Sequence, residues 1–139
     1  MDFILEDTVL WIFDDDIPAF NMAEISFRQM AGHAALFNYT GNIFLTQHAI
    51  LIEGEQNLSI KLAALNEIYL GFDEVYKPSY IKNFGLFWKP LRITYLANNI
   101  RTERVYLHIH QSLFGNRNAK WYNTIKSIIE CPTDYPFDT

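Results

Sequence analysis

The chain has 139 residues, of which half are hydrophobic and 19% are charged, so it fits one compact domain and is no charge-rich disordered tail. Its formal net charge of −5 argues against general nucleic-acid binding, which needs a basic surface. The charge is uneven, because residues 1–74 hold twelve Asp or Glu and two Lys or Arg (−10), whereas residues 75–139 hold four and nine (+5).

The cellular location is predicted from the cysteine count and from the N-terminus. Cys131 is the only cysteine, so no intrachain disulfide forms, which is compatible with a reducing compartment. The first residues lack the basic and apolar regions of a signal peptide, and no apolar run approaches the roughly 18 residues of a membrane span. We therefore expect a soluble, cytoplasmic protein.

The first predicted element is a short apolar run at residues 8–13 (TVLWIF), which ends at the acidic residues 14–16 and at Pro18. It indicates a strand or an N-terminal segment packed on the core. The three adjacent carboxylates lack the spacing of a calcium loop, so we interpret them as a solvated turn.

Residues 24–30 (EISFRQM) have two interpretations. Ile25, Phe27 and Gln29 alternate with their neighbours, which predicts a strand. A helix over residues 18–31, capped by Asp16 and ended by Gly32, is the alternative.

Most of the remaining chain shows the period-two alternation of half-buried strands. A tight turn at residues 47–48 joins the first two of these strands, and a turn begins at Asn98. The predicted strands cover residues 41–46, 49–53, 58–62, 68–72, 91–96 and 105–109. Residues 77–89 show no clean period and contain Pro78 and Gly85, so we expect a long loop there.

The periodicity changes near the C-terminus, where a helix is predicted. Its apolar stripe has the spacing i, i+4, i+7 and i+8, and consists of Trp121, Ile125, Ile128 and Ile129. Asn116 or Asn118 can cap the N-terminus of this helix, and Pro132 stops it.

The order of elements predicts the fold class. No strand–helix–strand alternation occurs, so a parallel doubly wound sheet is excluded. We predict a mainly β fold: a partly open antiparallel barrel of about seven strands, capped by one C-terminal α-helix.

Several collinear segments resemble bacterial GRAM-like domains of the PH-like class. Residues 41–46 (GNIFLT) and 49–52 (AILI) look like that family's G-x-L-x-L-T-x-x-R-L-I-F hairpin, and residues 58–62 (LSIKL) look like its L-S-I-P-L strand. Further similar segments are residues 24–27, 91–93 and 118–125. Ala49 departs from the family's basic residue, and the aromatic loop 77–89 is a second departure.

The resemblance implies a division of the chain and a general function. Residues 24–130 would form the PH-like domain, residues 1–23 a segment packed on or flanking it, and residues 131–139 a poorly ordered tail. The family implies a binding module rather than an enzyme, with no cofactor. High-affinity phosphoinositide binding is not expected, because Arg28 is the only basic residue near the first strands.

The best candidate surface is the loop and strand start at residues 77–92, where aromatic and basic side chains gather. These are Lys77, Tyr80, Lys82, Phe84, Phe87, Trp88, Lys89 and Arg92. Such a mixture suits a protein partner or self-association, and it also suits an anionic membrane surface. The alternative is that the aromatic rings cap the barrel core and the lysines are merely solvated.

A metal-dependent enzyme is the weakest of the interpretations considered. His108 and His110 stand two residues apart on a predicted strand and can share one face, with His33, His48 or an acid as a third ligand. We expect both histidines to face solvent instead, because Val105, Leu107 and Ile109 take the core side. The serines do not lie in a nucleophile-elbow motif, and Cys131 has no histidine close to it in the sequence, so neither residue type is expected to act as a nucleophile.

Overall fold

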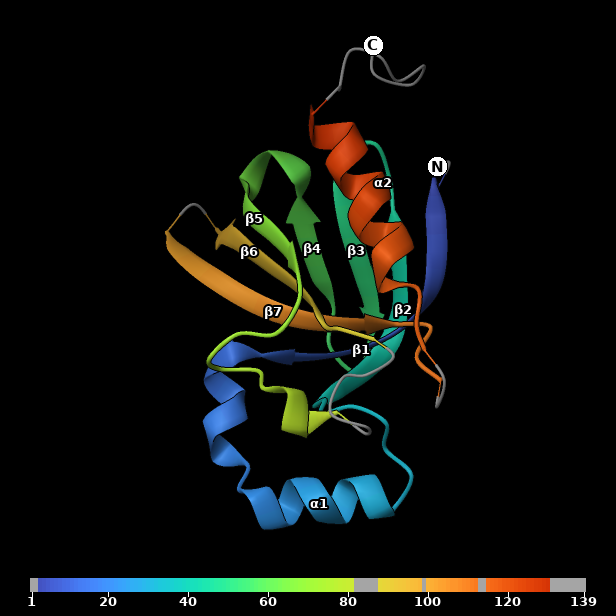
Figure 1. Ribbon diagram of the computed structural model, residues 1–139. Coiled ribbons are helices and arrows are strands. Elements are labelled where there is room, and N and C mark those ends of the chain that lie inside the picture. The colour runs from blue at the N-terminus through green and yellow to red at the C-terminus, as the bar shows by residue number, and fades with distance from the viewer. Residues whose placement is uncertain (1–2, 82–87, 99, 113–114, 131–139) are drawn as a thin grey trace.

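The computed structural model describes residues 3–81, 88–98, 100–112 and 115–130 (Figure 1). Its strands are β1 (Leu5–Phe13), β2 (Tyr39–Leu45), β3 (Ala49–Gly54), β4 (Leu58–Lys61), β5 (Leu65–Leu70), β6 (Leu91–Ala97) and β7 (Arg101–Ile109). Its α-helices are α1 (Met22–Met30) and α2 (Asn118–Glu130), and its short 3-10 helices are η1 (Asp14–Ala19), η2 (Leu62–Ala64) and η3 (Pro78–Tyr80). No helix within these ranges is long and apolar enough to cross a membrane.

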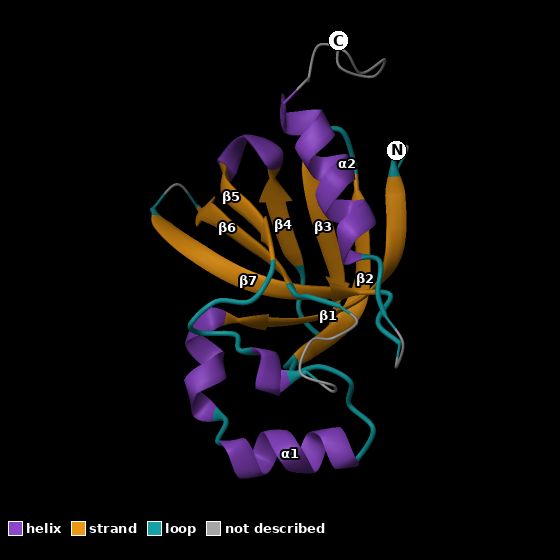
Figure 2. Ribbon diagram, in the orientation of Figure 1, coloured by secondary structure: helices purple, strands orange, loops and turns teal. Residues whose placement is uncertain are grey.

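The seven strands form one sheet in the order β4-β3-β2-β1-β7-β6-β5, and every pair of neighbours is antiparallel. The sheet curls into a nearly closed barrel, and α2 covers one of its ends (Figures 1 and 2). The edge strands β4 and β5 follow one another in the chain through η2 but do not pair. The predicted fold class, a partly open antiparallel barrel capped by one C-terminal helix, is confirmed.

Strand β1 lies at the centre of the sheet. It pairs with β2 from Leu5↔Leu45 to Trp11↔Tyr39, and with β7 from Val9↔Ile109 to Phe13↔Val105. Of the two interpretations of residues 8–13, the strand is correct, and it begins earlier, at Leu5. Part of the segment 1–23 therefore belongs to the barrel itself.

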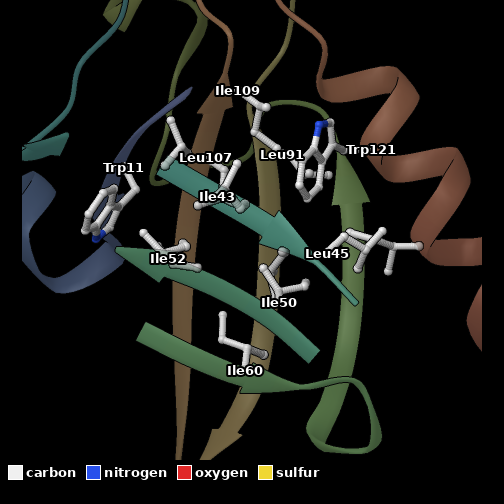
Figure 3. Packing of buried hydrophobic residues seen from close by; sticks show 14 of the residues in the cluster. Trp11, Ile43, Leu45, Ile50, Ile52, Ile60, Leu91, Leu107, Ile109 and Trp121 are labelled. Carbon is white, nitrogen blue, oxygen red and sulfur yellow. The ribbon is translucent and has the colours of Figure 1, made fainter. Parts of the chain in front are cut away.

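The barrel core is filled by the inward side chains of these strands and by one face of α2 (Figure 3). The strands contribute alternate residues, as the period of two requires, except in β5, where a register shift lies between Leu65 and Glu67. Buried strand residues of this core that Figure 3 labels are Trp11, Ile43, Leu45, Ile50, Ile52, Ile60, Leu91, Leu107 and Ile109. Helix α2 inserts Trp121, Ile125 and Ile128 as predicted, whereas Ile129 is 42% exposed.

A second hydrophobic core lies on the outer face of the barrel, over β1 and β7. Ile12 and Tyr106 point outward from these strands, opposite to Trp11 and Leu107. Side chains from η1, α1, the segments 34–36 and 76–81, and Trp88 cover them. The covering residues that are buried are Ile17, Ile25, Ala34, Ala35, Leu36, Tyr76, Ile81 and Trp88. Strand β7 is therefore buried on both faces along residues 105–109.

Residues 22–30 form helix α1, so the strand predicted for residues 24–30 is wrong. Asn21 accepts a hydrogen bond from the Glu24 backbone N–H (2.8 Å), and the Glu24 side chain accepts one from the Asn21 N–H (3.4 Å), which is a capping box. Gly32, with φ +103°, ends the helix in a Schellman motif in which the His33 N–H bonds the Arg28 carbonyl. The helical alternative over residues 18–31 is right about Gly32, but the cap is Asn21 and not Asp16.

Candidate functional site

The aromatic–basic loop at residues 77–92 is divided between core and surface. Trp88 is only 6% exposed and belongs to the second core, and half-buried Tyr80 packs edge-on against Tyr76, with ring centroids 5.7 Å apart. Lys77 and Lys89 are exposed. Lys82, Phe84 and Phe87 lie outside the described residues. The described aromatic rings of this loop therefore contribute to packing, but in the second core and not at the barrel core that the alternative interpretation named.

Arg92, the last member of the predicted surface, is held in an ionic network. Its guanidinium donates to Asp73 Oδ2 (2.9 Å) and to Glu67 Oε1, and it lies 4.5 Å from the centre of the Tyr69 ring. Tyr106 also donates to Asp73 Oδ2 (2.6 Å). Burial alone would raise the pKa of Asp73, but the hydrogen bonds from Tyr106, the Tyr76 backbone and Arg92 hold it below its usual value. The network fixes the segment after β5 onto the outer face of β6 and β7.

His108 is completely buried, so the expectation that it faces solvent is wrong. The Tyr76 hydroxyl donates to the Leu36 carbonyl (3.0 Å) and accepts from the Leu36 N–H (2.9 Å), which leaves His108 Nε2 to donate to the same oxygen (2.9 Å). Burial lowers the pKa of His108 to about 3 and raises that of Tyr76. Both groups are neutral near pH 7 and act as structural hydrogen-bond partners.

His110 lies apart from His108, beyond the end of β7. Its backbone is left-handed, with φ +54°, and its Nδ1 lies 3.7 Å from Asp7 Oδ1. Asp7 is already bonded to Arg117 Nη1 and to Trp121 Nε1, at 2.9 and 2.8 Å, and so anchors α2 to β1. Among the described residues, no group of three or more His, Cys, Asp or Glu is placed to hold a metal ion.

The most unusual exposed surface lies on α1, which stands at the far end of the second core from the barrel (Figures 1 and 2). Only Ile25 of this helix is buried. Met22, Phe27 and Met30 are 50%, 73% and 88% exposed. At 100° per residue they fall within one 140° sector together with Ala23 and Ser26, so we call these five residues the α1 apolar face.

The pattern of α1 is nearly symmetric about Ser26. Met22 and Met30 stand four residues on either side of it, and Glu24 and Arg28 stand two residues on either side. Arg28 donates to the Phe37 carbonyl (3.0 Å), and within the described chain it forms no ion pair with a carboxylate.

The α1 apolar face was not predicted from the sequence, because residues 24–30 were interpreted as a strand. A period of two placed Ile25 and Phe27 on the same face, whereas the helix places them on opposite sides. The signal that identifies the helix is the N-x-x-E capping box at Asn21 and Glu24, followed by Gly32.

Comparison with known proteins adds no further assignment: neither the family models nor the curated proteins searched gave a match to this chain.

Proposed function

We propose that this chain is a non-enzymatic binding module of the PH-like type that self-associates through the α1 apolar face. The observation that carries the proposal is the exposure of Met22, Phe27 and Met30 on one side of a short helix. Methionine and phenylalanine are usually buried, and adaptable Met-rich surfaces are common at binding sites. The opposite side of the helix is fixed by Ile25 in the second core, so the apolar face is presented by a supported element.

A second copy of the chain is the occupant that fits this face best, because the face is self-complementary. In an antiparallel pair of α1 helices centred on Ser26, Met22 of one copy meets Met30 of the other. A twofold interface requires such complementarity of a surface with itself. The small Ser26 side chain at the centre allows close approach of the two helices.

The size of the face sets the expected affinity. A nine-residue helix is roughly 14 Å long. Two such helices bury less area than the roughly 1,200 Å² of a stable interface, so the dimer is weak and reversible.

An anionic membrane suits this face poorly. Acidic residues 14–16 precede α1 in η1, and Glu24 lies on the helix itself, so the surroundings repel anionic head groups. In the described part of loop 77–92, Trp88 is buried and Arg92 is ion-paired, which removes two of the residues that suggested lipid binding. Lipid association is retained as an outcome of the test.

The GRAM-like assignment is likewise a proposal. It is supported by the similar segments that coincide with β2, β3, β4, β6 and α2 in the same order. The segment 24–27 does not support it, because those residues are helical.

The experiment compares the protein with its Phe27→Glu variant by sedimentation velocity up to about 1 mM. We expect concentration-dependent dimerisation of the unmodified chain and at least about tenfold weaker dimerisation of the variant, because a carboxylate replaces the one aromatic side chain of the face. Ile100→Glu is the matched control, since Ile100 is 83% exposed and lies away from α1. This control should dimerise normally.

A monomer throughout the concentration range would overturn the proposal. So would dimerisation that Phe27→Glu leaves unchanged, since the interface would then lie elsewhere. Pelleting with vesicles rich in phosphatidylserine that depends on Phe27, without dimerisation, would assign the face to a membrane instead.

A further inference from the structure

The barrel has one open seam, between the edge strands β4 and β5 (Figures 1 and 2). An edge strand has backbone N–H and C=O groups without a sheet partner on one side. The register of the neighbouring pairs determines which residues carry these groups at the seam.

On β4 these residues are Ser59 and Lys61. The Leu62 N–H donates to the carbonyl of its direct partner His48 (2.8 Å), so this is a hydrogen-bonded pair of the β3–β4 ladder. Hydrogen-bonded pairs alternate along an antiparallel ladder, so Ile60 also bonds to β3. Ser59 and Lys61 therefore direct their backbone N–H and C=O toward the free edge.

The facing wall of the seam is the end of β6, where β5 no longer covers it. The Gly71 N–H donates to the Pro90 carbonyl (3.1 Å), which fixes the side of β6 that bonds to β5. By the same alternation the backbone of Leu96 faces this side. Strand β5 begins at Leu65, which pairs with Tyr95, so Leu96 lies beyond the β5 ladder.

A groove of about 650 Å³ lies between these walls. It is lined by the β4 edge and by the end of β6, including Asn57, Ser59, Lys61, Tyr95, Leu96 and Asn98. Among the described residues that line it, Lys61 is the one charged residue and none is a carboxylate. The groove thus combines a free strand edge, polar amide side chains and one cation.

We propose that this seam groove binds an extended acidic peptide, which adds to β4 as an antiparallel or parallel strand. Its backbone would bond to the free groups of Ser59 and Lys61, and a carboxylate side chain would pair with the Lys61 ammonium. Strand addition at a sheet edge takes its affinity from backbone hydrogen bonds and its specificity from alternate side chains. This inference is independent of the α1 dimer, because the two surfaces share no residue.

The test uses the Phe27→Glu chain, so that dimerisation does not intervene, and a synthetic peptide with the sequence Glu-Val-Thr-Val-Glu, blocked at both ends. Backbone amide NMR shifts and hydrogen exchange are followed on titration. We expect saturable shifts centred on Ser59, Lys61 and Leu96, with slowed exchange of the Ser59 and Lys61 amides. The same peptide with N-methylated amides is the control and should not bind, because it cannot donate to a strand edge.

Two variants assign the contact. Ser59→Pro removes a free-edge N–H without touching the β3–β4 ladder, and should weaken binding about tenfold, as one lost hydrogen bond implies. Lys61→Glu should weaken binding of the acidic peptide and favour a peptide with Lys in place of Glu. The N-methylated peptide keeps the test valid if Ser59→Pro fails to fold.

Absence of shifts at millimolar peptide, or shifts that fall away from the seam, would overturn the proposal. Equal binding of the N-methylated peptide would do the same. Protection of Ser59 and Lys61 that rises with protein concentration alone would show that a second copy, and not a peptide, occupies the edge.

Discussion

At the scale of single residues, His108 shows how a second core changes the role of a polar side chain. It is placed between the barrel and Tyr76 with its ring entirely buried, and its Nε2 donates to the Tyr76 hydroxyl. Because burial disfavours the charged form, the folded protein keeps this imidazole neutral down to about pH 3. The unfolded chain binds a proton near pH 6.5.

His108 therefore makes the free energy of unfolding depend on pH. The folded pKa is depressed, so its contribution is complete above the unfolded pKa and is lost as the pH falls toward the folded pKa. Between pH 7 and pH 5 this group should lower stability by about 2 kcal/mol. His108→Gln keeps a donor for Tyr76 but does not titrate.

Urea unfolding at both pH values should therefore show a smaller loss for His108→Gln than for the unmodified chain. An equal loss in the two proteins would show that His108 is not the group responsible.

At the scale of elements, the two α-helices are both amphipathic but are used differently. Helix α2 turns its apolar face into the barrel, and Asn118 at its start is completely buried. The Asn118 side chain accepts from the Ile109 N–H (2.8 Å) and donates to the carbonyls of Lys89 (2.8 Å) and Leu107 (3.0 Å). It thereby joins α2 to β7 and to the chain entering β6. Helix α1 buries Ile25 alone and leaves its apolar face outward.

Asn118→Ala should lower the free energy of unfolding by about 3 kcal/mol, because it leaves buried backbone groups without partners. Asn116→Ala is the matched control. Asn116 is partly exposed and accepts from the Asn118 N–H (3.0 Å), so its loss should cost only about 1 kcal/mol. Chemical denaturation of both variants checks the prediction, and costs of similar size would contradict the anchoring role of Asn118.

At the scale of the whole molecule, some of the unevenly distributed charges form ion pairs between the two halves of the chain. Arg92 pairs with Glu67 and Asp73, and Arg117 pairs with Asp7. In each case a cation of the basic second half neutralises acids of the first half. The charge imbalance between residues 1–74 and 75–139 is therefore explained in part by ion pairs within the fold, and not only by the charge of the protein surface.

The barrel was predictable because its strands bury one face and so alternate with period two. The C-terminal helix was predictable from the stripe of Trp121, Ile125 and Ile128. Strand β7 is buried on both faces and not on one, so the alternation in its sequence wrongly assigned His108 to solvent. Helix α1 was not predicted because its nine residues include few apolar positions, and these fit the period of a strand as well as that of a helix. The placement of Trp88 depends on contacts distant in sequence, which periodicity does not report.

The central claim is that two copies pair through α1 about an axis at Ser26. The most direct measurement is disulfide cross-linking of Ser26→Cys in a Cys131→Ser background, since Cys131 is the chain's only cysteine. Across a twofold axis a residue meets its own copy, so this cysteine lies within the short reach of a disulfide.

Mild oxidation of Ser26→Cys should give a covalent dimer. Ala23→Cys in the same background should give much less, because Ala23 would face residue 29 of the second copy. Adding Phe27→Glu to Ser26→Cys should suppress the cross-link. Cross-linking of Ala23→Cys as fast as that of Ser26→Cys, or insensitivity to Phe27→Glu, would contradict the account.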